Sequence, residues 1–195
     1  MIDKLLKPMG YIRIRHSEKY WFDLFIPALL AVLIATIIFI LPKPIILLGK
    51  DSLIGLVNGI LQILSGFYIA SMAAVATFQK EGMDEYMVGA PPKLKGQSLT
   101  RRNFLTYLFG YLAFMSILMY FVGGFIQLSA LNISFWIVDL HSSVKFILVT
   151  AYLFVICNIL TTTVLGMHFL IDKIHREEPK FVNEKGDKPA DKTKN

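Results

Sequence analysis

Three side chains that can bind a metal ion recur at helical spacing near the end of the last apolar segment. His168, Asp172 and His175 stand at positions i, i+4 and i+7, which places them on one face of a helix. Two histidines and a carboxylate are a ligand set that zinc accepts. A single helix, however, presents poor geometry for more than two ligands, and no second cluster in the sequence completes a site. We therefore predict no metal site and interpret these residues as polar groups at the boundary of a membrane helix.

The rest of the sequence offers no motif for catalysis. It has no Gly-x-Ser-x-Gly, His-Glu-x-x-His, P-loop or Cys-x-x-Cys pattern. The single cysteine, Cys157, lies inside an apolar segment, where a small packing residue is a simpler interpretation than a nucleophile. We expect neither enzymatic activity nor a cofactor.

Long apolar blocks set the fold class. The chain is 55% hydrophobic and only 17% charged, which is unusual for a soluble domain. A bilayer core about 30 Å thick is crossed by about 20 apolar residues, and lipid forces such a segment to be helical. We therefore predict an all-α integral membrane protein with four transmembrane helices within residues 24–171. The expected spans are residues 24–41, 53–78, 104–127 and 146–171.

The distribution of basic residues predicts how the chain crosses the membrane. The net charge is +6, and 17 of the 20 Lys and Arg residues lie in segments 1–23, 79–103 and 172–195. By the positive-inside rule we expect these three segments, and so both termini, to be cytoplasmic. The charged tail, 172–195, has few apolar residues and is expected to be largely disordered. We assign the excess charge to lipid headgroups and expect no direct binding of nucleic acid.

Polar groups inside the expected spans are few. The cores contain no Asp, Glu, Lys or Arg, which disfavours ion-coupled transport. Three amides remain at depth: Asn58 and Gln62 in the second span and Asn158 in the fourth. We interpret them as interhelical hydrogen-bonding groups. The alternative, which stays open, is that they line a pore.

Small residues recur along one side of the second span. Gly55-x-x-x-Gly59 and Gly66-x-x-x-Ala70 are patterns that let two helix backbones approach closely, and Ala73 lies seven residues after Gly66. Such a seam serves either packing within one subunit or packing between subunits of a homo-oligomer. The sequence leaves both interpretations open.

The middle loop, residues 79–103, is more than a solvated linker. We expect the second helix to continue to about Met87, and Ser98 or Thr100 to cap the third helix. Charged residues here are mixed with apolar ones, which makes the loop a candidate docking surface for a soluble partner. The alternative is that Arg101 and Arg102 contact only headgroups. The candidate docking residues are Met83, Tyr86, Met87, Lys93, Leu94, Lys95, Arg101 and Arg102.

A motif-like run extends from this loop into the third span. It reads Gly89-x-Pro91-Pro92-x-Leu94-Lys95-Gly96, then Leu99-Thr100-Arg101-Arg102-x-Phe104 and Leu108-Phe109-Gly110-Tyr111-Leu112. The run resembles the small membrane subunit (KwaA) of the Kiwa bacterial antiphage defence system, and the four-span layout agrees with it. The resemblance implies a homo-oligomer that assembles with a soluble, DNA-binding, KwaB-like partner and senses phage attack at the envelope. It assigns no role to an individual residue.

These observations lead to one functional hypothesis and two alternatives. The outer loops, residues 42–52 and 128–145, are too short to form a receptor domain, so we expect a stimulus to arrive through the bilayer or through these very short exposed segments. We expect a membrane sensor and scaffold in which the glycine seam passes a packing change to residues 79–87. The alternatives are a pore-forming effector that depolarises the cell and a small-molecule transporter.

Overall fold

The computed structural model describes residues 7–14, 19–49, 51–77, 79, 82–86 and 91–175. The side chains of Trp136, Val138 and residues 172–175 lie outside this description. Four of the helices are long and apolar enough to cross a membrane, as the sequence predicts. Their apolar segments are Trp21–Ile40, Leu53–Thr77, Arg101–Leu128 and Ser142–Ile171.

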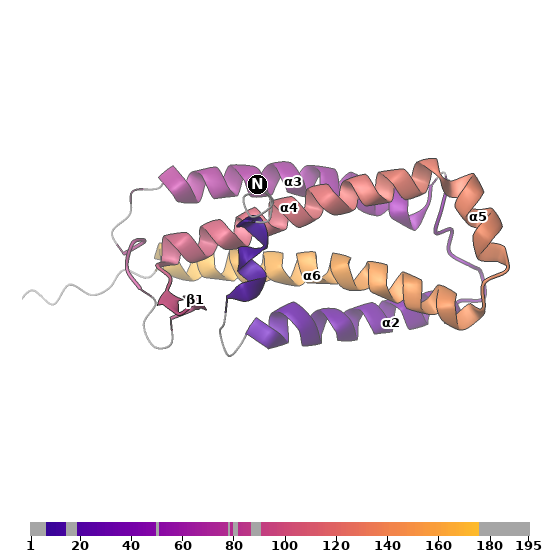
Figure 1. Ribbon diagram of the computed structural model, residues 1–195, viewed down its shortest axis with the longest axis horizontal. Helices are drawn as coiled ribbons and strands as arrows, with labels where there is room; N and C mark the ends of the chain where they lie inside the picture. The colour runs from indigo at the N-terminus through magenta and orange to yellow at the C-terminus, as the bar shows by residue number, and fades with distance from the viewer. Residues whose placement is uncertain are drawn as a thin grey trace, which may run out of the picture.

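The described chain is mostly helical, and its long helices form an up-and-down bundle (Figure 1). Two short helices precede the bundle: η1 is a 3₁₀ helix and η2 is a single π-helical turn that runs directly into α2. The elements in chain order are η1 (Lys7–Arg13), η2 (Trp21–Phe25), α2 (Ile26–Ile40), α3 (Leu53–Thr77), β1 (Lys93–Leu94), β2 (Gln97–Ser98), α4 (Arg101–Leu128), α5 (Ala130–Val138) and α6 (Ser142–His175).

The bundle consists of two helix pairs. Helix α3 packs along α4, and α2 packs along α6; the pairs meet where α4 faces α6, over a smaller contact than either pair makes internally (Figure 1). The larger core cluster joins α3, α4, α6 and η1 through residues such as Tyr68 and Phe109. The smaller one joins α2 to α6 around Ala31, Ala35 and Cys157, and so Cys157 is a buried packing residue.

The outside of the bundle is apolar. Helix α2 buries its alanines against α6, while Leu29, Leu33 and Ile37 on the same helix are 58%, 52% and 51% exposed. Similar residues, such as Ile63 of α3 and Phe125 of α4, are more than two-thirds exposed. An exterior of this kind needs a partner other than water.

The start of α4 agrees with the sequence, but the end of α3 does not. The Thr100 hydroxyl accepts a hydrogen bond from the Asn103 amide at 3.3 Å, which is the predicted N-cap. Helix α3, however, ends at Thr77 rather than at Met87, and residues 82–86 form turns and a bridge to Thr100. Arg102 Nη1 donates to two carbonyls in the last turn of α3. These carbonyls therefore have partners although the helix does not continue.

Two further elements were not predicted. Strands β1 and β2 form a short antiparallel hairpin whose turn, Lys95–Gly96, has φ angles of 50° and 86°. Two successive left-handed residues are typical of tight hairpin turns. Helix α5 lies in the stretch expected to be an outer loop and connects α4 to α6 across the end of the bundle (Figure 1).

Candidate functional site

The N-terminal segment packs into the opening between the two helix pairs, beside α4 (Figure 1). Tyr11 of η1 is 1% exposed, and its ring stacks on Tyr111 of α4 with the centroids 5.0 Å apart. Phe104 of α4 contacts the same ring at 6.3 Å. Aromatic packing therefore fixes a segment that the sequence places outside the transmembrane domain.

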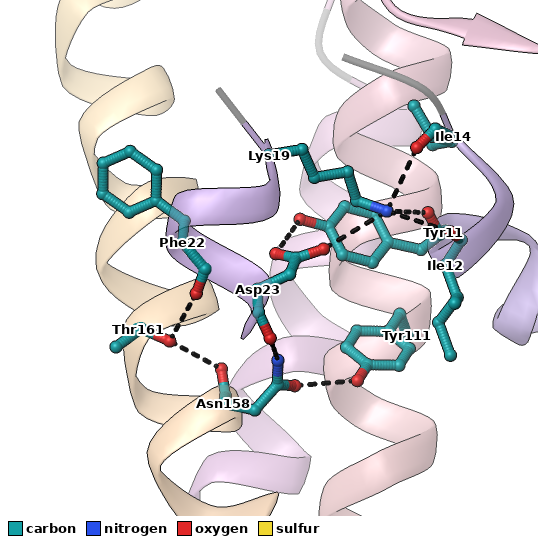
Figure 2. A network of polar contacts seen from close by, with 9 residues as sticks. All are labelled: Tyr11, Ile12, Ile14, Lys19, Phe22, Asp23, Tyr111, Asn158 and Thr161. Atoms are coloured by element: carbon teal, nitrogen blue, oxygen red, sulfur yellow. Dashed lines mark hydrogen bonds and ion pairs between the residues drawn. The ribbon is translucent and has the colours of Figure 1, made fainter. Parts of the chain in front are cut away.

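Lys19 and Asp23 connect η1 to the beginning of the first span. The Lys19 ammonium lies 3.2 Å from the Asp23 carboxylate and donates to the Tyr11 carbonyl at 2.6 Å. It also donates to the carbonyls of Ile12 and Ile14, both at 3.2 Å (Figure 2). A cation at the carboxyl end of a short helix is stabilised by the carbonyls that point toward it. Burial lowers the pKa of Lys19, and the Asp23 carboxylate opposes this shift.

Asp23 is the centre of this arrangement. Its second carboxylate oxygen accepts a hydrogen bond from the Tyr11 hydroxyl at 3.1 Å, and its backbone carbonyl accepts one from the Asn158 amide at 2.8 Å. Burial and then the Asp23 charge raise the pKa of Tyr11, so the hydroxyl remains a protonated donor. The span begins at Trp21 rather than at residue 24, which places Asp23 in its first turn.

Helices α4 and α6 complete the network from the other side. The Tyr111 hydroxyl donates to the Asn158 side-chain oxygen at 2.8 Å, and the Thr161 hydroxyl donates to the Phe22 carbonyl at 3.1 Å (Figure 2). The Phe22 and Asp23 carbonyls, which accept hydrogen bonds from α6, belong to the π-helical turn η2. Turns of this kind are often found at functional sites. Side chains from η1, η2, α4 and α6 thus converge. We call this set the N-terminal network: Tyr11, Lys19, Asp23, Tyr111, Asn158 and Thr161.

Of the residues in the N-terminal network, the sequence analysis identified Asn158 as a hydrogen-bonding group. Asn158 was predicted to make interhelical hydrogen bonds, and it makes them to Tyr111 and Asp23. Lys19 and Asp23 are four residues apart, as an ion pair on a helix requires, and this spacing is the signal that could have identified them. Nothing in the sequence placed Tyr11 next to Tyr111.

A second polar cluster fastens the middle loop at the same end of the bundle. The Arg102 guanidinium binds both oxygens of Asp84, at 2.7 and 3.0 Å, while donating to the Val75 carbonyl at 2.9 Å. Arg101 donates to the Gly82 carbonyl at 3.1 Å. The hydrogen bonds from Arg102 lower the pKa of Asp84. Both arginines therefore hold the loop against α3 and α4.

The structure divides the predicted docking residues into buried and exposed ones. Met83 is 8% exposed and belongs to the core, and Leu94 is partly buried against the same core. Arg101 and Arg102 are partly buried. Tyr86 is 60% exposed, and Met87 lies outside the described residues. Within the described loop the exposed members of the predicted set are Tyr86, Lys93 and Lys95.

At the opposite end of the bundle a single glutamine joins α4 to the first connecting loop. Gln127 donates to the Ser52 hydroxyl at 2.8 Å and accepts from the Gly49 amide at 3.1 Å. The sequence gave no indication of this contact. Like the N-terminal network, it joins a segment outside the long helices to α4 by side-chain hydrogen bonds.

The predicted glycine seam faces outward. Added Cβ atoms at Gly59 and Gly66 would meet nothing within 4 Å, and Ala70 and Ala73 are exposed. Gly55 alone approaches a neighbour, the Gln127 side chain. Packing among the described residues therefore does not use Gly59 or Gly66.

Close helix approach occurs instead at Gly123 and Gly166. A Cβ on Gly123 would collide with the Asn58 side chain, and one on Gly166 would lie 2.8 Å from Leu108. Neither glycine belongs to the pattern that the sequence singled out. Spacing alone thus identified small residues but not the helix faces on which they pack.

The three amides do not line a common path within the described chain. Asn158 belongs to the N-terminal network. Asn58 and Gln62 line an open groove of about 570 Å³ between α3 and α4, whose surface includes Gly59, Tyr120 and other residues of the two helices. The Asn58 side-chain oxygen is buried there and has no hydrogen-bond partner among the described residues.

Of the residues His168, Asp172 and His175, which the sequence analysis interprets as polar groups at a helix boundary, only the first has a described side chain. His168 packs edge-on against Phe169, with the ring centroids 6.1 Å apart. The side chains of Asp172 and His175 lie outside the described part of the chain. Among the described residues no group of three His, Cys, Asp or Glu side chains gathers as a metal site would require.

Comparison with known protein families, with curated proteins and with solved structures finds no match to this chain.

Proposed function

We propose that the chain is a sensor and scaffold subunit of the bacterial inner membrane, in the manner of the Kiwa antiphage system that it resembles. In this proposal residues 1–23, 79–103 and 172–195 are cytoplasmic. Four apolar helices with exposed apolar surfaces support membrane insertion. The concentration of 17 of the 20 Lys and Arg residues in those three segments supports the orientation.

The N-terminal network is the observation that carries the sensing role. It joins η1 and the start of α2 to α4 and α6, in the half of the bundle on which the middle loop lies. The two helix pairs meet over a smaller contact than each makes internally, so this network has a large share in setting their relative position. A change in bilayer thickness or tension alters helix tilt and would act on the network first.

The output is the exposed part of the middle loop. Arg102 fastens this loop to α3 and α4, so a movement of these helices carries Tyr86, Lys93 and Lys95 with it. The sequence had suggested that α3 itself extends into the loop and passes the packing change to it. Because α3 ends at Thr77, we assign this role to the contacts of Arg102 instead. An exposed tyrosine between charged residues suits a soluble protein partner, here a KwaB-like DNA-binding protein. The membrane subunit itself need not touch nucleic acid.

Self-association is part of the proposal. Gln62 is exposed about 14 Å from the start of α3, near the middle of a span, where an amide facing lipid is costly. The open Gly59 and Gly66 beside it allow a second helix to approach closely. Replacing both glycines with Leu should abolish signalling and leave membrane insertion intact. Full signalling by that variant would contradict a role for the seam.

A pore-forming effector is the second candidate. Asn58 and Gln62 share one groove on the open face of α3, so an oligomer built on that face would line its centre with amides. Purified protein in liposomes should then conduct ions, whereas a scaffold should not. A transporter is less well supported, because charged residues in the described spans occur only near the helix starts, at Asp23, Arg101, Arg102 and Lys145.

The scaffold proposal is tested by purification of the tagged protein from its native host in mild detergent. We expect a soluble DNA-binding protein to co-purify at fixed stoichiometry and to be lost when Tyr86, Lys93 and Lys95 are replaced by Ala, Gln and Gln. Lys43→Gln, which removes an exposed cation at the other end of the bundle, is the matched control. Recovery of an oligomer alone, with ion flux in liposomes, would favour the pore.

A further inference from the structure

A pocket of about 510 Å³ lies beside the N-terminal network, between the N-terminal segment, α4 and α6. Its volume is in the range of small-molecule sites. We infer that this pocket binds an anionic phospholipid of the cytoplasmic leaflet. The inference rests on the proposal that the chain spans a membrane, and it names a ligand for the network that the proposed function uses.

The pocket has an apolar side and a polar side, as the binding of an amphiphilic molecule requires. Leu24, Met115, Phe154 and Val155 provide apolar walls from three different elements. Polar groups come from the other side. These are Arg13, Lys19, Asp23, Tyr111 and Asn158. An acyl chain fits the first surface and a headgroup the second.

The depth of the pocket matches the boundary between headgroups and hydrocarbon. Asn158 donates to the backbone carbonyl of Asp23, which lies in the first turn of the span Trp21–Ile40. The pocket is therefore level with the beginning of that span, where hydrocarbon meets headgroups. Tyr20 and Trp21, beside the pocket, are 71% and 58% exposed, as expected of aromatic residues at a membrane interface.

The charges of the pocket favour an anionic ligand. Lys19 and Asp23 neutralise each other, and Asn158 uses both its amide nitrogen and its oxygen within the chain. The exposed Arg13 guanidinium is the remaining charge among the described lining residues, so this described lining carries a net positive charge. Arginine binds a phosphodiester through two parallel hydrogen bonds, and this geometry suits a phospholipid headgroup.

A lipid held here would link membrane composition to the position of η1. Arg13 is the last residue of η1, and Tyr11 of the same helix is bonded to Asp23. A phosphate on Arg13 thus adds a contact that holds η1 against the network. Loss or exchange of that lipid would loosen η1, which is the change that the proposed sensor must detect.

The test combines native mass spectrometry with thermal unfolding of the detergent-purified, delipidated protein. We expect phosphatidylglycerol to be retained and to raise the midpoint of unfolding, and phosphatidylcholine to do so much less. Arg13→Gln should weaken retention of phosphatidylglycerol about tenfold, as loss of a charge-assisted contact implies. Lys7→Gln removes the same charge from the same helix, outside the pocket, and should bind as the native protein does.

Two further variants keep the test decisive. Met115→Trp fills the apolar wall and should reduce retention of both lipids. Because this change can disturb packing, Arg13→Lys provides an independent test and should keep part of the preference for phosphatidylglycerol. Equal retention by native protein and Arg13→Gln, or equal losses in Arg13→Gln and Lys7→Gln, would overturn the site.

Alkaline carbonate extraction of membranes separates this failure from failure of the proposed function. Protein that resists extraction but binds lipid independently of Arg13 would disprove the lipid site and leave the membrane proposal standing. Protein released by carbonate would disprove both.

Discussion

The two helix pairs hold together in different ways. Helices α3 and α4 bury large side chains, among them Leu61, Tyr68 and Leu112, none more than 2% exposed. Helices α2 and α6 bury mainly small ones, such as Ala31, Ala35 and Cys157. The first pair is therefore stabilised along its length by side-chain packing. The second pair depends more on what holds its ends, and at the N-terminal end this is the polar network.

In the proposed membrane sensor, this difference would provide a fixed part, α3 with α4, and an adjustable one, α2 with α6. Lipid is as apolar as leucine, so small residues on α2 bring little preference for α6 over lipid beyond close packing. Polar contacts inside such an environment are strong and directional. Asn158 and Thr161 donate to the Asp23 and Phe22 carbonyls just before α2, and in the proposed function a signal would break these hydrogen bonds.

Asp23→Ala should have the largest effect on stability. It leaves the partly buried Lys19 without its carboxylate and removes the acceptor of the Tyr11 hydroxyl. Loss of one partner of a buried ion pair costs about 3–5 kcal/mol, and we expect a decrease of this order in the free energy of unfolding in detergent. Asp23→Asn keeps an acceptor for Tyr11 and should cost less. Equal stability of Asp23→Ala and native protein would contradict the role of the network.

The packing of the two pairs is compared by matched leucine substitutions. Leu112→Ala removes a fully buried side chain of α4 and should cost about 2–5 kcal/mol. Leu33→Ala removes the same atoms from α2, where the side chain is 52% exposed, and should cost less than about 0.5 kcal/mol. Thermal unfolding of both variants provides the measurement. Similar costs would mean that α2 is packed as tightly as α4.

The glycines can be compared in the same way. Gly123→Ala forces the Asn58 side chain to move and should cost about 1–3 kcal/mol. Gly59→Ala adds the same methyl group in open space and should leave the stability of the isolated subunit unchanged. If Gly59→Ala weakens only the oligomer, measured by light scattering in detergent, the seam acts between subunits. A loss of subunit stability would show that the seam packs within the chain.

The smallest effect is expected at the exposed ion pair of the middle loop. The pKa of Asp84 is lowered in the folded protein, so its stabilising contribution is present above the ordinary carboxyl range. That contribution is lost as the pH falls through the lowered pKa. The difference in unfolding midpoint between native protein and Asp84→Asn should be small at neutral pH and should vanish in strong acid. A difference that grows in acid would contradict the sign of the shift.

Much of the fold follows from the sequence because lipid imposes few solutions. Four apolar blocks bounded by charge predict four long helices, and Thr100 is a recognisable cap. The end of α3 was predicted wrongly, because the residue that satisfies its last carbonyls, Arg102, lies 25 residues beyond Thr77 in the chain. Such a contact between distant residues leaves no local pattern.

The candidate site was harder to predict for the same reason. Tyr11 and Tyr111 are adjacent in space and 100 residues apart in the sequence. Asn158 could be recognised because an amide in an apolar helix demands a partner, but its partner could not be named. The glycines of α3 illustrate the opposite case: Gly59 and Gly66 form a clear pattern, yet the chain itself does not pack against them.

The central claim is that the N-terminal network sets the position of α2 relative to the α3–α4 pair. It is tested most directly by electron–electron distance measurements between spin labels on Leu33 of α2 and Leu118 of α4, with the buried Cys157 replaced by Ala. The network predicts a narrow distance distribution that broadens in Asp23→Ala. Labels on Ile63 of α3 and Phe121 of α4 should give a distribution that does not change. If the distribution between α2 and α4 also stays unchanged in Asp23→Ala, the network does not position α2.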